Sequence, residues 1–218
     1  DFKTRQVLGY TDKFPRWAIA YKFFAEEVVT RLKKVTWEVG RTGKITPLAH
    51  LDPVDIDGAT VRKATLNNKW DIERKGVKLN AMVWVRRSND VIPEIMGVAQ
   101  MTEEAKDIEV PKICPACGAE LIERGMLQFC PNNYNCKPQV VQKLVHFASR
   151  DAMDIENFSE KSAEQFYELL NVRNVADLYS LTAEQLALLP EWKDKKISRF
   201  LDAIEASRHC RLNNFIFA

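Results

Sequence analysis

The sequence predicts a multidomain α+β protein made of a small β-barrel, a module held together by four cysteines and a helical domain. Short strand-like runs fill residues 35–95, four cysteines fall within residues 114–136, and apolar residues recur with a helical period from residue 140 onward. A length of 218 residues exceeds what one ordinary domain needs, which favours several modules over one large core.

Composition narrows the class of protein. The chain is 46% hydrophobic and 28% charged with 8 Gly and 9 Pro, which excludes collagen-like, low-complexity and wholly disordered proteins. Its most apolar stretch, residues 17–24, is interrupted by Lys22, so we expect a cytosolic protein with no membrane segment. The net charge of +2 is far from that of a histone-like binder and leaves room only for a local basic face.

Residues 16–23 alternate strictly and predict a strand with two different faces. Trp17, Ile19, Tyr21 and Phe23 would face a core. On the other side two alanines lie between Arg16 and Lys22, a low surface that an anionic ligand could approach. A solvated edge strand is the alternative, and the pattern alone does not decide between them.

The barrel is predicted from five short runs separated by turn signals: Val35–Val39, Ile45–Leu51, Ala64–Leu66, Met82–Val85 and Val91–Ile95. One helix is expected at residues 70–75, with Asn67 or Asn68 as its N-cap and Gly76 as its left-handed stop. Five strands and one helix in this length are typical of a small barrel of the oligonucleotide-binding (OB) type.

The strongest chemical signal is the spacing C-x2-C-x12-C-x5-C, formed by Cys114, Cys117, Cys130 and Cys136. Two close thiolate pairs can surround one Zn²⁺ tetrahedrally and supply roughly 10–16 kcal/mol of folding free energy to a segment with few apolar residues. A disulfide pair and an iron–sulfur cluster are the alternatives, and a reducing cytosol disfavours the first. With four protein ligands the zinc would be structural, while Cys210 would be a free thiol.

Two arginine-bearing turns are candidate phosphate contacts: Gly40-Arg41-Thr42-Gly43, and the run that starts at Arg86-Arg87 and ends at Val91-Ile92-Pro93. Each turn alone is more simply a solvated basic turn. Two such turns on one barrel, followed by a zinc module and helical hairpins, favour nucleic acid as the ligand.

The last segment is predicted to be helical, with a capping box at Thr182 and Gln185 and a stop at Pro190. Similar turns at residues 157–161 and 191–195 lie 34 residues apart, which suggests an internal duplication. Catalytic patterns are scarce, because the histidines His50, His146 and His209 are scattered and no common nucleotide, hydrolase or metalloprotease motif occurs.

These features together resemble the bacterial NAD-dependent DNA ligases. The resemblance rests on residues 8–11 (LGYT), 14–23 (FPRWAIAYKF), 40–43 (GRTG), 64–68 (ATLNN), 90–93 (DVIP) and the four cysteines in order. It implies four parts: the tail of a nucleotidyltransferase (adenylation) domain at 1–26, an OB-fold domain at 27–109, a four-cysteine zinc finger at 110–138 and part of a helix-hairpin-helix domain at 139–218.

The resemblance also implies a function. The family seals nicks in duplex DNA between a 3′-hydroxyl and a 5′-phosphate by passing AMP from NAD through an active-site lysine, with Mg²⁺ in the complete enzyme. That lysine lies in a K-x-D-G motif, and no lysine of this sequence is followed by x-Asp-Gly. We therefore expect a catalytically incomplete, monomeric piece that binds nicked DNA, and the alternative is a non-catalytic module that occupies nicks or DNA ends.

By resemblance, Lys22 is the catalytic and cofactor-binding residue that contacts the adenylyl phosphate. Arg41 and Arg87 match positions that hold DNA phosphates, with Thr42, Arg86, Val91 and Ile92 beside them. Cys114, Cys117, Cys130 and Cys136 would bind the structural Zn²⁺.

The sequence departs from the family at several turns. The family's histidine before Asn68 is replaced by Asn67, and its usual glycines before the fourth barrel strand and before Asp90 appear as Asn80 or Ala81 and as Asn89. Asparagine tolerates a positive φ better than most residues. The helical hairpins lack their usual glycines around residues 157–160 and 191–194, so their phosphate contact is only a hypothesis.

Overall fold

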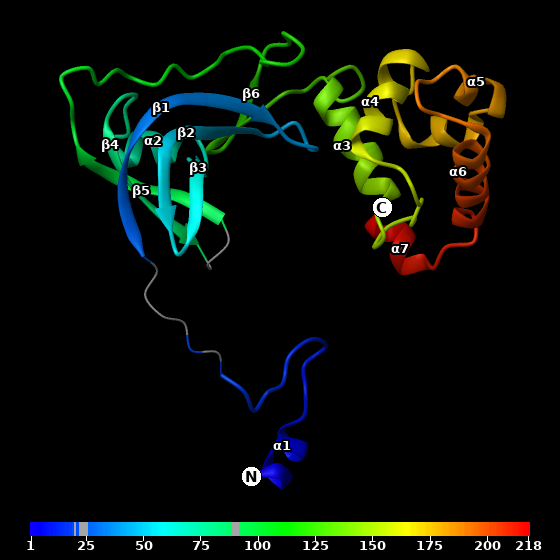
Figure 1. Cartoon of the computed structure of the whole chain (residues 1–218), viewed down its shortest axis with the longest axis horizontal. Coiled ribbons are helices and arrows are strands. Elements are labelled where there is room, and N and C mark those ends of the chain that lie inside the picture. The colour runs from blue at the N-terminus through cyan, green and yellow to red at the C-terminus, as the bar shows by residue number, and fades with distance from the viewer. Residues whose placement is uncertain (20, 22–25, 89–91) are drawn as a thin grey trace.

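A computed structural model describes residues 1–19, 21, 26–88 and 92–218 (Figure 1). Along the described chain a short helix is followed by a β-barrel, a small β-ribbon and a group of helices. The predicted α+β class is thus confirmed, including the closed barrel and the grouping of the four cysteines. No helix within these described ranges is long and apolar enough to cross a membrane.

Five strands of the described chain close the barrel in the order β1-β2-β3-β5-β4. They are β1 (Glu27–Val39), β2 (Ile45–Ile56), β3 (Ala59–Thr65), β4 (Met82–Ser88) and β5 (Ile92–Gln100). Their inward-facing side chains form one core in which Leu32, Ala49, Val83, Val85 and Ile95 are fully buried. The alternation of buried and exposed positions is what a barrel with a filled interior requires.

Strand β1 is longer than the sequence predicts, because it belongs to two strand pairs. Residues 27–31 pair with β4, and residues 32–39 pair with β2 after an irregularity between Leu32 and Lys34. A bulge of this kind bends a strand, so one segment can turn the corner that closes the barrel. The cations at positions 31, 33 and 34 hide this strand from a search for apolar alternation.

The helix between β3 and β4 follows its predicted signals. Helix α2 (Lys69–Lys75) begins after the N-cap Asn68, whose side chain accepts a hydrogen bond from the Asp71 N–H, and ends at Gly76 in the left-handed conformation. Asn67 (φ 58°) and Asn80 (φ 64°) also adopt positive φ, so these two asparagines keep the turn geometry, whereas Asn89 lies outside the described residues.

The N-terminal segment corrects one prediction. Helix α1 (Phe2–Leu8) is followed by a loop in which Trp17 packs edge-on against Tyr10. Within residues 16–21 the described positions are not in a strand, and the side chains of Ile19 and Tyr21 are 97% and 79% exposed. The predicted strand is wrong there because no other strand of the described chain lies alongside to accept its hydrogen bonds.

The C-terminal part is helical, as predicted. It contains α3 (Lys137–Ala148), α4 (Glu160–Leu169), the 3-10 helix η1 (Val175–Ser180), α5 (Ala183–Ala187), α6 (Asp194–Ser207) and α7 (Leu212–Phe217). Its core is centred on Leu144, Phe166, Leu178, Leu186 and Phe200, which are fully buried. The capping box of Thr182 and Gln185 is present, whereas η1 and α7 have no counterpart in the sequence prediction.

The two turns that lie 34 residues apart share their geometry. Asn157 (φ 62°) and Glu191 (φ 68°) both adopt the left-handed conformation, and each precedes an aromatic side chain. Phe158 packs on Phe166 with ring centroids 5.3 Å apart, and Trp192 packs on Phe200 at 5.4 Å. These pairs, and the first residues of α4 and α6, repeat with the same 34-residue offset.

One ionised side chain anchors α2 to the barrel. Asp71 accepts a hydrogen bond from Asn67 Nδ2 (3.0 Å) and forms ion pairs with Lys75 and Arg74 (2.6 Å each). Burial acts to raise the pKa of Asp71, but the hydrogen bonds from Lys75, Arg74 and Asn67 outweigh it and lower this pKa to about 2. Lys75 also donates to the Ile95 carbonyl of β5 (2.6 Å).

We predict that Asp71→Asn lowers the free energy of unfolding by about 2 kcal/mol at pH 7. Because the folded pKa lies below the ordinary 3.8, the stabilisation is complete above that value and is lost as pH falls through about 2. Urea unfolding followed by tryptophan fluorescence at pH 7, 4 and 2.5 measures both effects. Asp107→Asn is the control, since Asp107 pairs with Lys78 while its side chain is 89% exposed, and equal losses in the two variants would contradict the prediction.

Candidate metal centre and nucleic-acid interface

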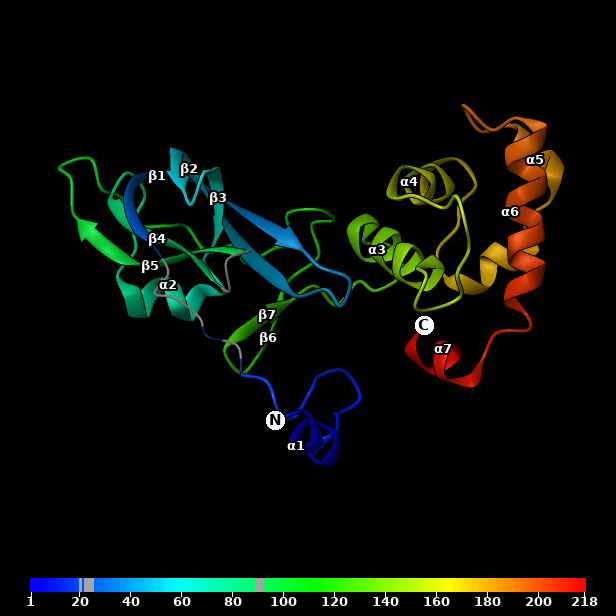
Figure 2. The same ribbon diagram turned by 60° about the horizontal axis from the view of Figure 1, so that its bottom comes forward.

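The four cysteines converge at the junction between the barrel and the helices. Cys114 and Cys117 precede strand β6 (Ile122–Arg124), Cys130 follows strand β7 (Leu127–Phe129), and Cys136 is the N-cap of α3. Their Sγ atoms all lie within 4.8 Å of one another. Figure 2 shows the β6–β7 ribbon at the end of the barrel that faces α3.

The sulfur positions fit a tetrahedral metal site. The Cys114 and Cys136 Sγ atoms are 3.9 Å apart, and those of Cys117 and Cys130 are 3.5 Å apart. Zn–S bonds of about 2.3 Å in a tetrahedron place the sulfurs roughly 3.8 Å apart, whereas a disulfide needs about 2.05 Å. The four thiols are free, so the arrangement suits one thiophilic cation and argues against the disulfide alternative.

The thiols differ in how readily they ionise. Burial opposes ionisation of Cys117, but hydrogen bonds from the Ala119 backbone and from Asn132 lower its pKa to about 7. Burial raises the pKa of Cys130, and it raises that of Cys136 to about 11 even though Gln139 donates a hydrogen bond to that thiol. Since the nearby thiols repel one another once ionised, a bound cation is what would hold all four as thiolates.

A zinc ion held by all four cysteines would have no open position for water or substrate, so its role would be structural. Trp37, Val39 and Ile45 of the β1–β2 hairpin pack against the buried cysteines. The cysteine cluster therefore forms a small core of its own between the barrel and α3.

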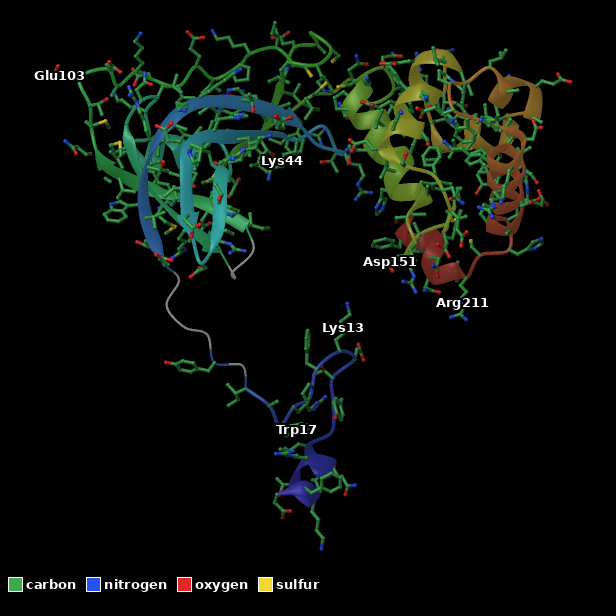
Figure 3. All side chains as sticks on the ribbon, in the orientation of Figure 1. Lys13, Trp17, Lys44, Glu103, Asp151 and Arg211 are labelled. Atoms are coloured by element: carbon green, nitrogen blue, oxygen red, sulfur yellow. The ribbon has the colours of Figure 1, made fainter. Side chains whose placement is uncertain are left out.

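Arg41 and Thr42 lie at the exposed turn between β1 and β2, next to the metal centre. Neither has an ion pair with any described residue. The following residue, Gly43, is buried, and its carbonyl accepts a hydrogen bond from the Cys130 N–H (2.8 Å). Lys44, labelled in Figure 3, forms a β-bridge with Phe129 at the tip of the barrel that faces the helices.

The second arginine pair lies elsewhere. Arg86 is bound across the sheet by Glu94, with N–O distances of 2.8 and 3.1 Å, and lies 3.8 Å from Glu27 on the other neighbouring strand. Arg87 is half-buried at the same end of β4 and has no ion pair with the described residues. Arg86 is thus already neutralised by two carboxylates, whereas Arg87 is not.

Of the three remaining predicted site residues, the structure describes only Ile92. Ile92, at the start of β5, is 60% exposed and is free to contact a ligand. Lys22 and Val91 lie outside the described residues.

The structure does not bring all the predicted DNA contacts together. Arg86 pairs with the first residue of β1, while Arg41 follows the last one. At about 3.3 Å per residue, the 14 residue steps from Glu27 to Arg41 separate the two backbone positions by at most about 46 Å. They form two separate basic sites, one at each end of this strand.

Two contributors could not be found from sequence patterns. Gln139 is fully buried against Cys130 and Cys136, although nothing but its position shortly after a cysteine marks it. Glu27 and Glu94 neutralise Arg86 through strand register, which depends on how the barrel closes. The glycine at position 43 was a visible signal, since glycine is favoured where φ is positive.

We predict that chelation releases one metal ion per chain and unfolds mainly residues 111–138, because this segment has only the small cysteine core to stabilise it. Metal analysis and hydrogen exchange measure the two effects. Cys117→Ser should lower metal retention, while Cys210→Ser should not, because Cys210 lies apart in the helical core. A metal content near zero in protein purified without chelators would defeat the assignment.

Comparisons with known proteins identify the barrel and its surroundings. Residues 29–107 match the family model described as the NAD-dependent DNA ligase OB-fold domain. The chain is 59% identical over 219 residues to a DNA ligase of Alkaliphilus metalliredigens and 59% identical over 217 residues to one of Alkaliphilus oremlandii. It is also 55% identical over 219 residues to the DNA ligase 2 of Clostridium acetobutylicum.

These alignments cover 99–100% of the chain but only 33% of each relative. The chain therefore spans about one third of the length of the relatives it matches, and the resemblance stated from its motifs is confirmed. It aligns along its whole length with part of these bacterial DNA ligases, and its residues 29–107 match the OB-fold domain of the NAD-dependent DNA ligases.

Proposed function

We propose that this chain is the DNA-holding part of an NAD-dependent DNA ligase that seals nicks between a 3′-hydroxyl and a 5′-phosphate. The observation that carries the proposal is the pair of basic sites on a ligase-type OB barrel, Arg41 at one end of β1 and Arg87 at the other. The complete enzyme would act in the bacterial cytosol, where NAD would supply the AMP that is transferred and Mg²⁺ would be the metal cofactor. This chain clamps the duplex.

The proposed contacts are electrostatic and independent of sequence. Guanidinium groups bind phosphate oxygens through charge-assisted hydrogen bonds and release counterions from the duplex. The two sites lie at opposite ends of β1, so they would contact separate phosphates of the duplex. Such contacts would position and distort the nick without reading bases.

The proposal divides the chain into the parts implied by the family: 1–26 from the adenylation domain, 27–109 the OB-fold, 110–138 a four-cysteine zinc finger and 139–218 helix-hairpin-helix. The paired turns at Asn157 and Glu191 support the last assignment through their shared geometry. We do not assign them a major share of DNA affinity. Glu191 forms an ion pair with Lys161 (2.7 Å), so a phosphate that approached the second turn would have to compete with this carboxylate.

The rival function is a non-catalytic module that occupies nicks or DNA ends. Both functions require DNA binding, and they differ in what the rest of the gene encodes. An upstream K-x-D-G domain in the same reading frame favours the ligase, whereas a start codon directly before Asp1 favours the separate module. The match to one third of long DNA ligases supports the first.

We predict that the chain binds a nicked duplex more tightly than an intact duplex of the same sequence, and that binding weakens steeply with salt. Arg41→Ala and Arg87→Ala should each weaken binding to all sequences alike and lower the salt slope by about one. Fluorescence anisotropy between about 50 and 300 mM KCl, in zinc-containing buffer, measures the affinities and slopes.

Arg86→Ala is the matched control for these variants. Because Glu27 and Glu94 already neutralise Arg86, its removal should leave the salt slope nearly unchanged. A slope change as large as that of Arg87→Ala would show that Arg86 contacts phosphate. Weak binding with no preference for the nick would reject DNA holding by this chain alone.

The role of Lys22 follows from the family motif, since its surroundings lie outside the described residues. A cation there would stabilise the charge that develops as the adenylyl phosphate is attacked. We predict that Lys22→Ala in the full-length enzyme spares DNA affinity but slows AMP transfer by at least about tenfold, as measured in single-turnover assays. Wild-type rates of AMP transfer in the Lys22→Ala enzyme would contradict this assignment. Lys13→Ala, which replaces another lysine of the same segment, is the control.

A further inference from the structure

The turn that carries Arg41 rests directly on the cysteine cluster. Its last glycine, Gly43, is buried, its N–H donates to the Gly40 carbonyl (2.9 Å), and its own carbonyl accepts from the Cys130 N–H (2.8 Å). The next residue, Lys44, forms a β-bridge with Phe129, which precedes Cys130. Two adjacent backbone contacts thus connect the turn to a candidate metal ligand.

No side chain fits at position 43. A Cβ there would lie 2.4 Å from the Cys130 carbonyl oxygen and 2.9 Å from Gln139 Oε1, both closer than real Cβ contacts allow. The φ angle of 81° adds strain for any residue other than glycine. Gly40, at the other end of the same turn, differs on both counts: its φ is outside the left-handed region, and its nearest neighbour would be the Lys44 carbonyl oxygen at 3.6 Å.

Gln139 closes the other side of this contact. Its side chain is fully buried in the first turn of α3, where Nε2 donates to the Cys130 carbonyl (3.2 Å). Its Oε1 has no hydrogen-bond partner among the described residues and lies against Gly43. One amide therefore touches both the backbone of a candidate metal ligand, Cys130, and the turn that carries Arg41.

We propose that Gly43 and Gln139 are positioning residues that couple metal occupancy at the four cysteines to the position of the Arg41 turn. With the metal bound, Cys130 and Cys136 are fixed, and Gln139 and the Cys130 N–H hold Gly43 between them. Without the metal, the Cys130 segment has too small a core to stay in place, and the turn loses the surface on which it rests. The coupling extends to DNA only as far as the proposed function of Arg41 holds.

Metal binding and the position of the turn are thermodynamically linked, so if the metal stabilises the turn, a change that destabilises the turn in its metal-bound position must weaken metal binding. A substitution in the barrel turn, far in sequence from the cysteines, should therefore weaken metal binding. This consequence separates a positioning role from a merely local effect on the turn. It also needs no DNA to be measured.

The test compares Gly43→Ala with Gly40→Ala in the full chain, using transfer of zinc to a chromogenic chelator. Loss of outer contacts to a metal site typically costs about 10–100-fold in affinity, so we expect Gly43→Ala to weaken zinc retention about tenfold or more and Gly40→Ala less than about twofold. Equal zinc retention in the two variants would overturn the proposal.

A second variant provides an independent test in case the Gly43→Ala protein does not fold. Gln139→Leu keeps a side chain of similar volume but removes the amide that donates to the Cys130 carbonyl. We expect a loss of zinc retention similar to that of Gly43→Ala. Gln142→Leu is its control, since Gln142 lies in the same helix and hydrogen-bonds Glu160 instead. Wild-type retention in Gln139→Leu would likewise overturn the proposal.

Hydrogen exchange of the wild-type chain tests the coupling in the opposite direction. Removing zinc should speed exchange in residues 40–46, while residues 59–65 of β3, elsewhere in the barrel, stay protected. Unchanged exchange at 40–46 would refute the coupling. DNA affinity is then measured with and without zinc. Loss of the Arg41 contribution on chelation supports the extension of the coupling to DNA. A zinc-loaded chain that does not bind DNA rejects the proposed function, and the coupling is then judged from the zinc-retention and hydrogen-exchange results alone.

Discussion

The hydrogen bond between the Cys130 N–H and the Gly43 carbonyl is the point on which the arrangement of the chain depends. It joins the β1–β2 hairpin of the barrel to the cysteine loop, and Gln139 ties the same loop to the first turn of α3. Barrel, cysteine module and helices thus meet at one small core. Because that core has few apolar side chains, we expect its order to depend on a metal ion held by the four sulfurs.

The bend in β1 explains the distribution of charge on the barrel. A single strand pairs with β4 through its first residues and with β2 through its last, so its two ends reach opposite sides of the barrel. One end carries the Arg41 turn beside the metal centre, and the other brings Glu27 next to Arg86. The net charge of +2 does not exclude a DNA-binding surface, because a small net charge still leaves room for local basic sites such as those of Arg41 and Arg87.

Local signals in the sequence predicted most of the elements. The Asn68 cap, the Gly76 stop and the capping box at Thr182 each specify a hydrogen bond within a few residues, and all three are present. The spacing of the four cysteines likewise predicted their convergence. The strand predicted at residues 16–23 failed at its described positions, because alternation cannot tell whether a neighbouring strand is available.

Long-range features escaped prediction for the same reason. The first half of β1 mixes apolar residues with charged ones, so it shows no clear alternation, and its role as a strand becomes evident from its pairing with β4. Gln139 has no motif of its own, and its burial follows from the way α3 meets the hairpin tip. Gly43 could be recognised as a special position, but the atom that excludes its side chain belongs to Cys130, 87 residues further along the chain.

Arg86 and Arg87 show why adjacent residues of one type need not share a role. Successive side chains of a strand point to opposite faces, so Arg86 meets Glu27 and Glu94 across the outside of the sheet while Arg87 follows the inward side of Val83 and Val85 to the barrel's end. A phosphate approaching Arg86 must compete with two carboxylates already in place. No ion pair joins Arg87 to a described carboxylate, and the register of the barrel therefore determines which of the two arginines is free of such competition.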